Sequence, residues 1–251
     1  MKIKDNTYII SGGVSGLGAA VCDMILENGG NAIIIDINEI KGNNSNKKAT
    51  YYIGDVADYS SIENIINSIY SDSNQIAGLI NCAGIGPAKR VVGRAGAGPI
   101  DFFQKVIHVN LIGTYNLIRL VAAHMQNNRS DMDEERGVII NTASIAAFDG
   151  QIGQAAYAAS KGGIVSMTLP LAREFARMGI RVMTIAPGIF ETPLMENFSP
   201  EVKQSLIDQT IFPKRLGQPL EYASLVKEII QNTMLNGEVI RLDGSIRMNS
   251  K

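Results

Sequence analysis

The feature that most constrains the fold is a regular alternation of short apolar runs with segments of helical periodicity. Apolar runs that predict strands occur at residues 7–10, 32–35, 49–53, 78–81, 138–142, 181–186 and 238–242. Helical periodicity occurs at residues 16–28, 61–70, 100–126 and 154–178. Strands joined through helices run parallel and are covered on both faces. The sequence therefore predicts an α/β protein, a single-domain doubly wound Rossmann fold over residues 1–251, with a parallel sheet of about seven strands and helices on both faces.

Composition excludes several classes of protein. Hydrophobic residues make up 45% of the chain and charged residues 19%, which is typical of an ordered globular protein. The net charge of −1 gives no basic field for nucleic acid, and the apolar runs are too short to predict a membrane span. The few cysteines and histidines predict neither a disulfide framework nor a metal site: Cys22, Cys82, His108 and His124. No targeting segment is recognisable, so the expected localisation is the cytoplasm, or alternatively an organelle matrix.

Three segments between these elements are predicted to be loops. Residues 41–48 and 127–136 are polar and expected at the surface. Residues 84–98 are rich in glycine and carry three basic side chains, Lys89, Arg90 and Arg94. The helix over residues 154–178 contains Pro170, where a kink is expected.

The turn after the first predicted strand is suited to a dinucleotide. Residues 11–18 read Ser-Gly-Gly-Val-Ser-Gly-Leu-Gly, so the backbone could approach a pyrophosphate at the N-terminus of the following helix. Asp36, at the end of the second strand, could accept hydrogen bonds from both ribose hydroxyls, and it would repel a 2′-phosphate, which favours NAD over NADP. Asp55 could accept from the adenine amino group while Val56 covers the ring. The alternatives are a tight turn without ligand for the glycines and helix caps for the two aspartates.

A second group of residues predicts acid–base chemistry. Tyr157 and Lys161 lie one helical turn apart, so an ammonium and a bound nicotinamide could favour the phenolate that takes the alcohol proton. Ser144 follows a predicted strand and could stabilise charge on the substrate oxygen, or it could be a turn residue. Asn110 is polar within an apolar helix and is either a satisfied core amide or a water site linked to Lys161.

Together these motifs resemble the short-chain dehydrogenase/reductase family over nearly the whole chain. Ser11 replaces the threonine of its Thr-Gly-x-x-x-Gly-x-Gly motif, and Cys82 replaces the second asparagine of its Asn-Asn-Ala-Gly motif. The resemblance implies the catalytic residues Asn110, Ser144, Tyr157 and Lys161, and substrate contacts from Ser144, Gln154 and Tyr157. It implies that NAD contacts Gly12, Ser15, Gly16, Leu17, Gly18, Asp36, Asp55, Val56, Cys82, Ala83, Gly84, Tyr157, Lys161, Pro187, Gly188, Phe190 and Thr192.

Four segments resemble a narrower group in that family, the type 2 3-hydroxyacyl-CoA dehydrogenases: residues 137–144, 155–168, 180–190 and 235–248. This resemblance implies NAD-dependent oxidation of short 3-hydroxyacyl-CoA esters, tolerance of steroid alcohols and a homotetramer. Residues 86–98 and 191–212 are less similar, and the second segment is the expected substrate loop or lid. Basic side chains of the first segment would then meet CoA phosphates, or simply be solvated.

Other functions are compatible with parts of this pattern. A steroid or other alcohol dehydrogenase would use the same catalytic residues. A 3-oxoacyl carrier-protein reductase would normally use NADPH, which Asp36 disfavours. A non-catalytic dinucleotide-binding scaffold is the alternative from another class, although a scaffold does not need the four catalytic groups together.

Overall fold

The computed structural model describes residues 1–39, 49–71, 75–94, 96–195 and 199–250, whose strands form one large parallel sheet. Its strand order is β3-β2-β1-β4-β7-β8-β9. The strands are β1 (Thr7–Ser11), β2 (Asn31–Asp36), β3 (Ala49–Ile53), β4 (Ile76–Asn81), β7 (Gly137–Thr142), β8 (Ile180–Pro187) and β9 (Val239–Leu242). The order reverses between β1 and β4, so ligands are expected at the carboxyl ends of these two strands. The predicted doubly wound fold is confirmed.

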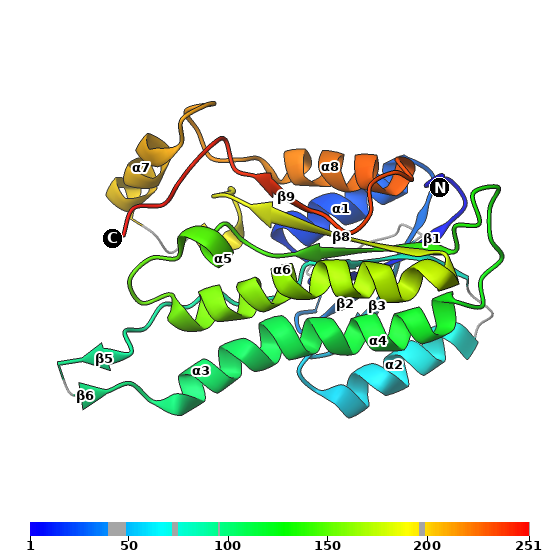
Figure 1. Cartoon of the computed structure of the whole chain (residues 1–251), viewed down its shortest axis with the longest axis horizontal. Coiled ribbons are helices and arrows are strands. Elements are labelled where there is room, and N and C mark those ends of the chain that lie inside the picture. The colour runs from blue at the N-terminus through cyan, green and yellow to red at the C-terminus, as the bar shows by residue number, and fades with distance from the viewer. Residues whose placement is uncertain (40–48, 72–74, 95, 196–198, 251) are drawn as a thin grey trace.

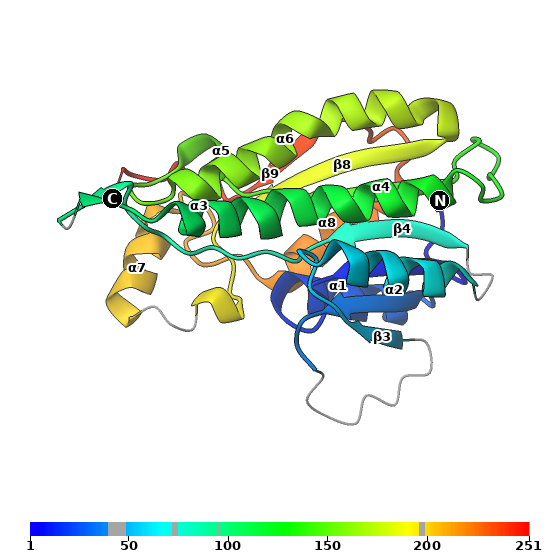
Figure 2. The same ribbon diagram turned by 90° about the horizontal axis from the view of Figure 1, so that it is seen from below.

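Helices cover both faces of the sheet (Figures 1 and 2). On one face, α1 (Gly16–Glu27) and α8 (Pro219–Gln231) pack on Tyr8 and Ile10 of β1. On the other face, Ile9 contacts the cluster built by α2 (Tyr59–Ser71), α4 (Thr114–Met125) and α6 (Ala155–Phe175). Successive residues of β1 therefore alternate between two apolar cores, as the pleat of a strand requires.

The segment predicted as one helix over residues 100–126 has three parts. It comprises α3 (Ile100–Ile107), a π-helical segment (His108–Gly113) and α4. By length and composition Ile100–Met125 could span a membrane, so the expectation that no apolar run reaches this length is wrong. In the structure Val106, Leu117 and Val121 are fully buried inside the protein, as in the core helix of a globular domain.

Several elements were not predicted. The chain between β8 and β9 forms α8 and α7 (Pro200–Gln209), so the expected loop over residues 191–212 is partly helical. The start of α8 carries a recognisable signal, because Pro219 follows Gln218, which forms a capping box with Glu221. A short helix, α5 (Ala146–Asp149), follows β7.

The three predicted loops and the helix that contains Pro170 can be compared with the structure in turn. Residues 84–98 contain a short hairpin of β5 (Val92–Gly93) and β6 (Gly96–Ala97), which extends away from the body of the molecule (Figures 1 and 2). Residues 127–136 contain no helix or strand, as expected. The predicted surface turn over residues 41–48 lies outside the described residues. The helix α6 continues through Pro170 to Phe175.

Candidate active site

The glycines of the turn after β1, which we call the glycine cradle, lie so close to neighbouring backbone that a side chain at Gly12 or Gly18 would clash. A Cβ at Gly12 would lie 2.7 Å from the backbone nitrogen of Ala83, and Gly12 adopts a φ of +69°. A Cβ at Gly18 would lie 2.1 Å from the carbonyl oxygen of Gly12. The turn therefore needs glycine to bring the N-terminus of α1 against the end of β4, and this fits the backbone approach that a pyrophosphate requires.

Asp36 lies beside this cradle, as predicted. It is 8% exposed at the end of β2, and its Oδ2 accepts a hydrogen bond of 3.1 Å from the backbone N–H of Val14. Its Oδ1 accepts bonds from the backbone and the side chain of Asn38, at 2.9 and 3.1 Å. Three donors thus fix the orientation of the carboxylate at the edge of the glycine turn. The geometry fits a ribose-binding carboxylate.

Asp55 and Val56 follow β3 on the same edge of the sheet. Val56 is buried against Gly113, where a Cβ would lie 2.8 Å from its side chain. Asp55 Oδ1 accepts a 2.9 Å hydrogen bond from the backbone N–H of Ala57, which closes a turn ahead of α2. The helix-cap alternative for Asp55 is therefore wrong, because Asp58 Oδ1 accepts the 3.0 Å hydrogen bond from the backbone N–H of Ser61 in the first turn of α2. Contact of Asp55 with adenine stays a prediction.

The end of β4 joins the cradle to the catalytic residues. The backbone N–H of Cys82 donates to the carbonyl of Ser11, and Ala83 lies against Gly12. At Gly84 a Cβ would lie 3.2 Å from Asn110 Oδ1 and 3.5 Å from Lys161 Nζ. The predicted Cys82–Gly84 segment thus passes directly from the cofactor cradle to the predicted catalytic residues.

Ser144, Tyr157 and Lys161 are brought together by β7 and α6. The Ser144 side chain lies close enough to the Tyr157 hydroxyl to act on its pKa. Burial raises the pKa of Tyr157, and the Ser144 side chain acts in the opposite direction. Lys161 Nζ lies 5.9 Å from the centroid of the Tyr157 ring and donates a 2.8 Å hydrogen bond to the Thr142 carbonyl.

Lys161 is 5% exposed, and this burial lowers its pKa to about 8, with the nearby Cys82 thiol opposing the shift. A lysine in this state can still carry charge near neutral pH. It can also exchange its proton there, as a group in a proton path must.

Asn110 is fully buried in the π-helical segment and is satisfied by hydrogen bonds. Its Oδ1 accepts from the backbone N–H of Ile85, and its Nδ2 donates to the Ile85 carbonyl, both at 2.8 Å. Nδ2 also donates to Ser160 Oγ at 3.0 Å. The structure therefore supports the satisfied core amide for Asn110, and the water site linked to Lys161 stays a prediction.

The segment after β8 returns to the glycine turn. Gly188 donates its backbone N–H to Leu242 of β9, and Pro187 accepts from Ile145, next to Ser144. The Thr192 side chain lies beside Gly16, where a Cβ would be 3.4 Å from Thr192 Cβ. Residues far apart in sequence thus enclose one region at the carboxyl edge of the sheet.

Not every predicted substrate residue is placed at the catalytic group. Gln154 Oε1 accepts a 3.0 Å hydrogen bond from the backbone N–H of Gln151, at the start of α6. Among the described contacts it makes none with Ser144 or Tyr157. Its substrate role stays a prediction.

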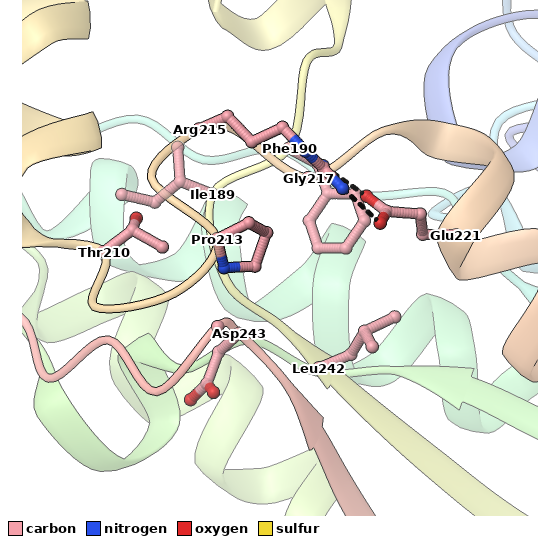
Figure 3. A pocket seen from close by; sticks show the side chains of 10 residues that line it. Ile189, Phe190, Thr210, Pro213, Arg215, Gly217, Glu221, Leu242 and Asp243 are labelled. Carbon is pink, nitrogen blue, oxygen red and sulfur yellow. Dashed lines mark hydrogen bonds and ion pairs between the residues drawn. The ribbon is translucent and has the colours of Figure 1, made fainter.

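A pocket of about 110 Å³ lies next to the segment after β8 (Figure 3). Ile189 and Phe190 line it on one side, with Leu242 and Asp243 at the end of β9 on another. The chain before α8 closes it through Thr210, Pro213 and Arg215, and Arg215 is held by two hydrogen bonds to Glu221. Sequence reasoning singled out only Phe190 of these residues for the site. Thr210, Pro213 and Arg215 lie on the part of the chain around α7 and α8, which were missed, whereas Ile189, Leu242 and Asp243 lie at or beside the ends of β8 and β9.

Other proteins share this arrangement. Residues 6–203 match the family model described as short chain dehydrogenase. The chain is 48% identical over 253 aligned residues to 3-hydroxyacyl-CoA dehydrogenase type-2 of Bos taurus, covering 98% of this chain and 97% of that protein. It is 46% identical, with the same coverage, to the protein of that name from Homo sapiens.

A solved structure agrees with these relatives. The crystal structure of 3-hydroxyacyl-CoA dehydrogenase type-2 from Mycobacterium avium superposes with a TM-score of 0.89 at 35% identity, covering 98% of this chain and 97% of that one. The glycine cradle, the Ser144–Tyr157–Lys161 cluster and the sheet order are therefore those of an oxidoreductase, and the chain belongs to the short-chain dehydrogenase family.

Proposed function

We propose that this enzyme oxidises the 3-hydroxyl group of short 3-hydroxyacyl-CoA esters to a ketone with NAD. The observation that carries the chemistry is the placement of Ser144 beside Tyr157, where it acts to lower the pKa of the phenol, with Lys161 Nζ 5.9 Å from the centroid of the Tyr157 ring. The observation that carries the substrate is the high identity to proteins named 3-hydroxyacyl-CoA dehydrogenase type-2 over nearly their whole length.

The side chains have separate roles in this reaction. Ser144 would donate a hydrogen bond to the substrate oxygen, and Tyr157 would accept the hydroxyl proton. The dinucleotide, when bound, accepts the hydride that leaves the carbinol carbon. Because burial raises the pKa of Tyr157 in the free protein, the phenolate needs positive charge nearby, and the Lys161 ammonium is part of that charge.

Asp36 supports NAD as the cofactor. Its carboxylate stands at the edge of the glycine turn, fixed by Val14 and Asn38. A 2′-phosphate would bring a second negative charge to this point. In the part of the chain that the structure describes, no lysine or arginine forms an ion pair with Asp36 that could offset the repulsion.

The loop before the hairpin supports a CoA ester as substrate. A Cβ at Gly86 would lie 3.8 Å from the Tyr157 ring, and the backbone N–H of Lys89 donates to the Gly153 carbonyl at 2.8 Å. The loop therefore borders the catalytic tyrosine before it carries Arg90 and Arg94 outward. Exposed basic side chains that follow this border on the same loop could bind phosphates of a long substrate that projects from the site.

A homotetramer is part of the same proposal. Ile112 of the π-helical segment, Tyr115 of α4 and Leu169 of α6 are 37%, 50% and 43% exposed. Gly162 of α6 has open space around its Cα. An apolar surface with small residues favours helix packing between subunits. We place the enzyme in the cytoplasm or an organelle matrix, where its two free thiols would stay reduced.

A substrate panel tests the function. NADH formation is measured with 3-hydroxybutyryl-CoA, free 3-hydroxybutyrate, a 17β-hydroxysteroid and a simple secondary alcohol. We expect the CoA ester to give the highest kcat/KM, because binding energy from the CoA part can orient the reacting carbon. Oxidation of the steroid alone would favour a steroid dehydrogenase. Absence of turnover with every alcohol would favour a scaffold.

A further inference from the structure

A buried chain of hydroxyl groups joins α8 to the end of β7, beneath the candidate active site. Tyr222 of α8 is fully buried, and its hydroxyl lies 2.7 Å from Thr142 Oγ1. Thr142 Oγ1 lies 2.5 Å from the carbonyl oxygen of Asn81 on β4. Cys82 Sγ lies 3.9 Å from the Tyr222 hydroxyl. Hydrogen bonds between polar atoms inside the apolar core thus link β4, β7 and α8, which lie far apart in the sequence.

The direction of these hydrogen bonds follows from the chemistry of the groups. The Asn81 carbonyl can only accept, so the Thr142 hydroxyl donates to it. With that proton used, Tyr222 donates to Thr142 Oγ1, and the Cys82 thiol can donate to the Tyr222 oxygen. Burial raises the pKa of Tyr222 well above its ordinary value, so this phenol keeps its proton throughout the working pH range.

The same threonine holds the catalytic lysine. The Thr142 carbonyl oxygen accepts the 2.8 Å hydrogen bond from Lys161 Nζ. Thr142 is the last residue of β7. The N–H of the peptide that joins it to Ala143 donates to the Ile185 carbonyl of β8 at 2.8 Å, and its side chain is held by Tyr222 and Asn81. A clamp on its side chain therefore limits the freedom of the carbonyl that receives the ammonium.

We propose that Tyr222 is a positioning residue for Lys161: its hydroxyl holds the Thr142 side chain, and the Thr142 carbonyl holds the lysine ammonium. The inference rests on the proposed function, because positioning matters only if Lys161 takes part in catalysis. It assigns an active-site role to α8, which lies on the opposite face of the sheet from α6 (Figure 1).

The pKa of Lys161 should depend on the Tyr222 hydroxyl. The titratable groups facing its ammonium are Tyr157 from α6 and Cys82 after β4, with Tyr222 of α8 behind Thr142. Among the described residues no carboxylate forms an ion pair with it. A looser Thr142 carbonyl would stabilise the ammonium less, so loss of the Tyr222 hydroxyl should lower the Lys161 pKa further below about 8.

The first test reads this pKa without turnover. The full-length protein is labelled with ¹⁵Nζ-lysine, the Lys161 signal is identified by its loss in Lys161→Met, and its titration is followed by NMR. We expect Tyr222→Phe to shift the midpoint down by about half a pH unit, the size of effect of one modest hydrogen bond. Tyr8→Phe is the matched control, because Tyr8 is also fully buried in the same core and its hydroxyl donates to the Lys2 carbonyl, away from Thr142.

A second variant tests the path through Thr142. Thr142→Val keeps the carbonyl and removes the hydroxyl, so it should reproduce the shift of Tyr222→Phe, and the double variant should add nothing further. If Tyr222→Phe does not fold, Thr142→Val alone still tests the proposal. An unchanged Lys161 midpoint in both variants, or an equal shift in Tyr8→Phe, would overturn the proposal.

The kinetic readout separates this proposal from the function. With less positive charge beside Tyr157, the pH of half-maximal alcohol oxidation should rise by about half a unit in Tyr222→Phe, while KM for NAD stays unchanged. A fall in rate at an unchanged pH midpoint would mark a merely structural role and contradict positioning. If the wild type shows no turnover with any alcohol, the proposed function is refuted. If Tyr222→Phe still shifts the Lys161 midpoint in that case, the positioning of Lys161 by Tyr222 is retained.

Discussion

At the scale of single residues, the chemistry of this enzyme depends on the environment of Tyr157 and Lys161. Burial raises the pKa of the phenol and lowers that of the lysine, so each is moved away from its charged form. The Ser144 side chain partly offsets this for Tyr157, and the Thr142 carbonyl fixes Lys161. Positive charge from a bound nicotinamide would move the phenol toward its reactive form, which couples proton transfer to cofactor binding.

The variant Tyr157→Phe should lose about 10²–10⁴-fold in kcat, the usual contribution of a general acid–base group. Affinity for NAD should remain close to that of the wild type, because phenylalanine keeps the ring. Initial rates of NADH formation and calorimetric titration with NAD measure the two quantities. Turnover at the wild-type level would refute the proposed proton acceptor.

Cofactor choice should depend on Asp36. We expect the wild type to have a higher kcat/KM with NAD than with NADP. In Asp36→Asn the preference should narrow by about tenfold or more, because the charge that repels the 2′-phosphate is gone. Asp23→Asn, an exposed position on α1, serves as control. Equal use of both cofactors by the wild type would show that Asp36 does not face the ribose.

At the scale of elements, the segment from the end of β4 to α3 has two parts with different roles. Its first part is tied to the active site through Asn110 and Gly153. Its second part is the hairpin, where Val91 and Val92 are 68% and 69% exposed. A two-stranded hairpin by itself is marginally stable, so its conformation is expected to change when a substrate binds.

The basic residues of this segment give a prediction about substrate. Replacing Lys89, Arg90 and Arg94 together by alanine should lower kcat/KM for a CoA ester by about tenfold or more, and leave a steroid alcohol nearly unchanged. The control is alanine at Lys4, Arg173 and Arg177, three exposed basic residues near the amino edge of the sheet. If both substrates are affected equally, the segment has no role specific to CoA.

At the scale of the whole molecule, the sheet places all site residues at one edge, and exposed apolar side chains on α4 and α6 remain available for other subunits. We predict a homotetramer, with a mass in light scattering four times that of one chain at micromolar concentration. Leu169→Glu should dissociate it, because a carboxylate cannot be buried without a partner. Met234→Glu, at an 89% exposed position outside these helices, should not. A monomer mass for the wild type would contradict the prediction.

The sequence by itself determined the sheet and the glycine turn, and it predicted the catalytic set. Apolar runs and helical periods are local, so β1 to β4 and β7 to β9 could be located to within two residues at either end. The spacing of Tyr157 and Lys161 fixes their common direction on any helix. Motif resemblance supplied Ser144 and Asn110.

The tertiary structure decided the contacts between distant segments. α8 was missed although its start carries a capping box, and with it went Tyr222 and the pocket residue Glu221. The bond from Tyr222 to Thr142 joins positions 80 residues apart. No local pattern reports such a contact, because it exists only after the sheet has brought α8 and the end of β7 together. Local order thus follows from propensity and periodicity, whereas the environment that sets the pKa of Lys161 follows from packing.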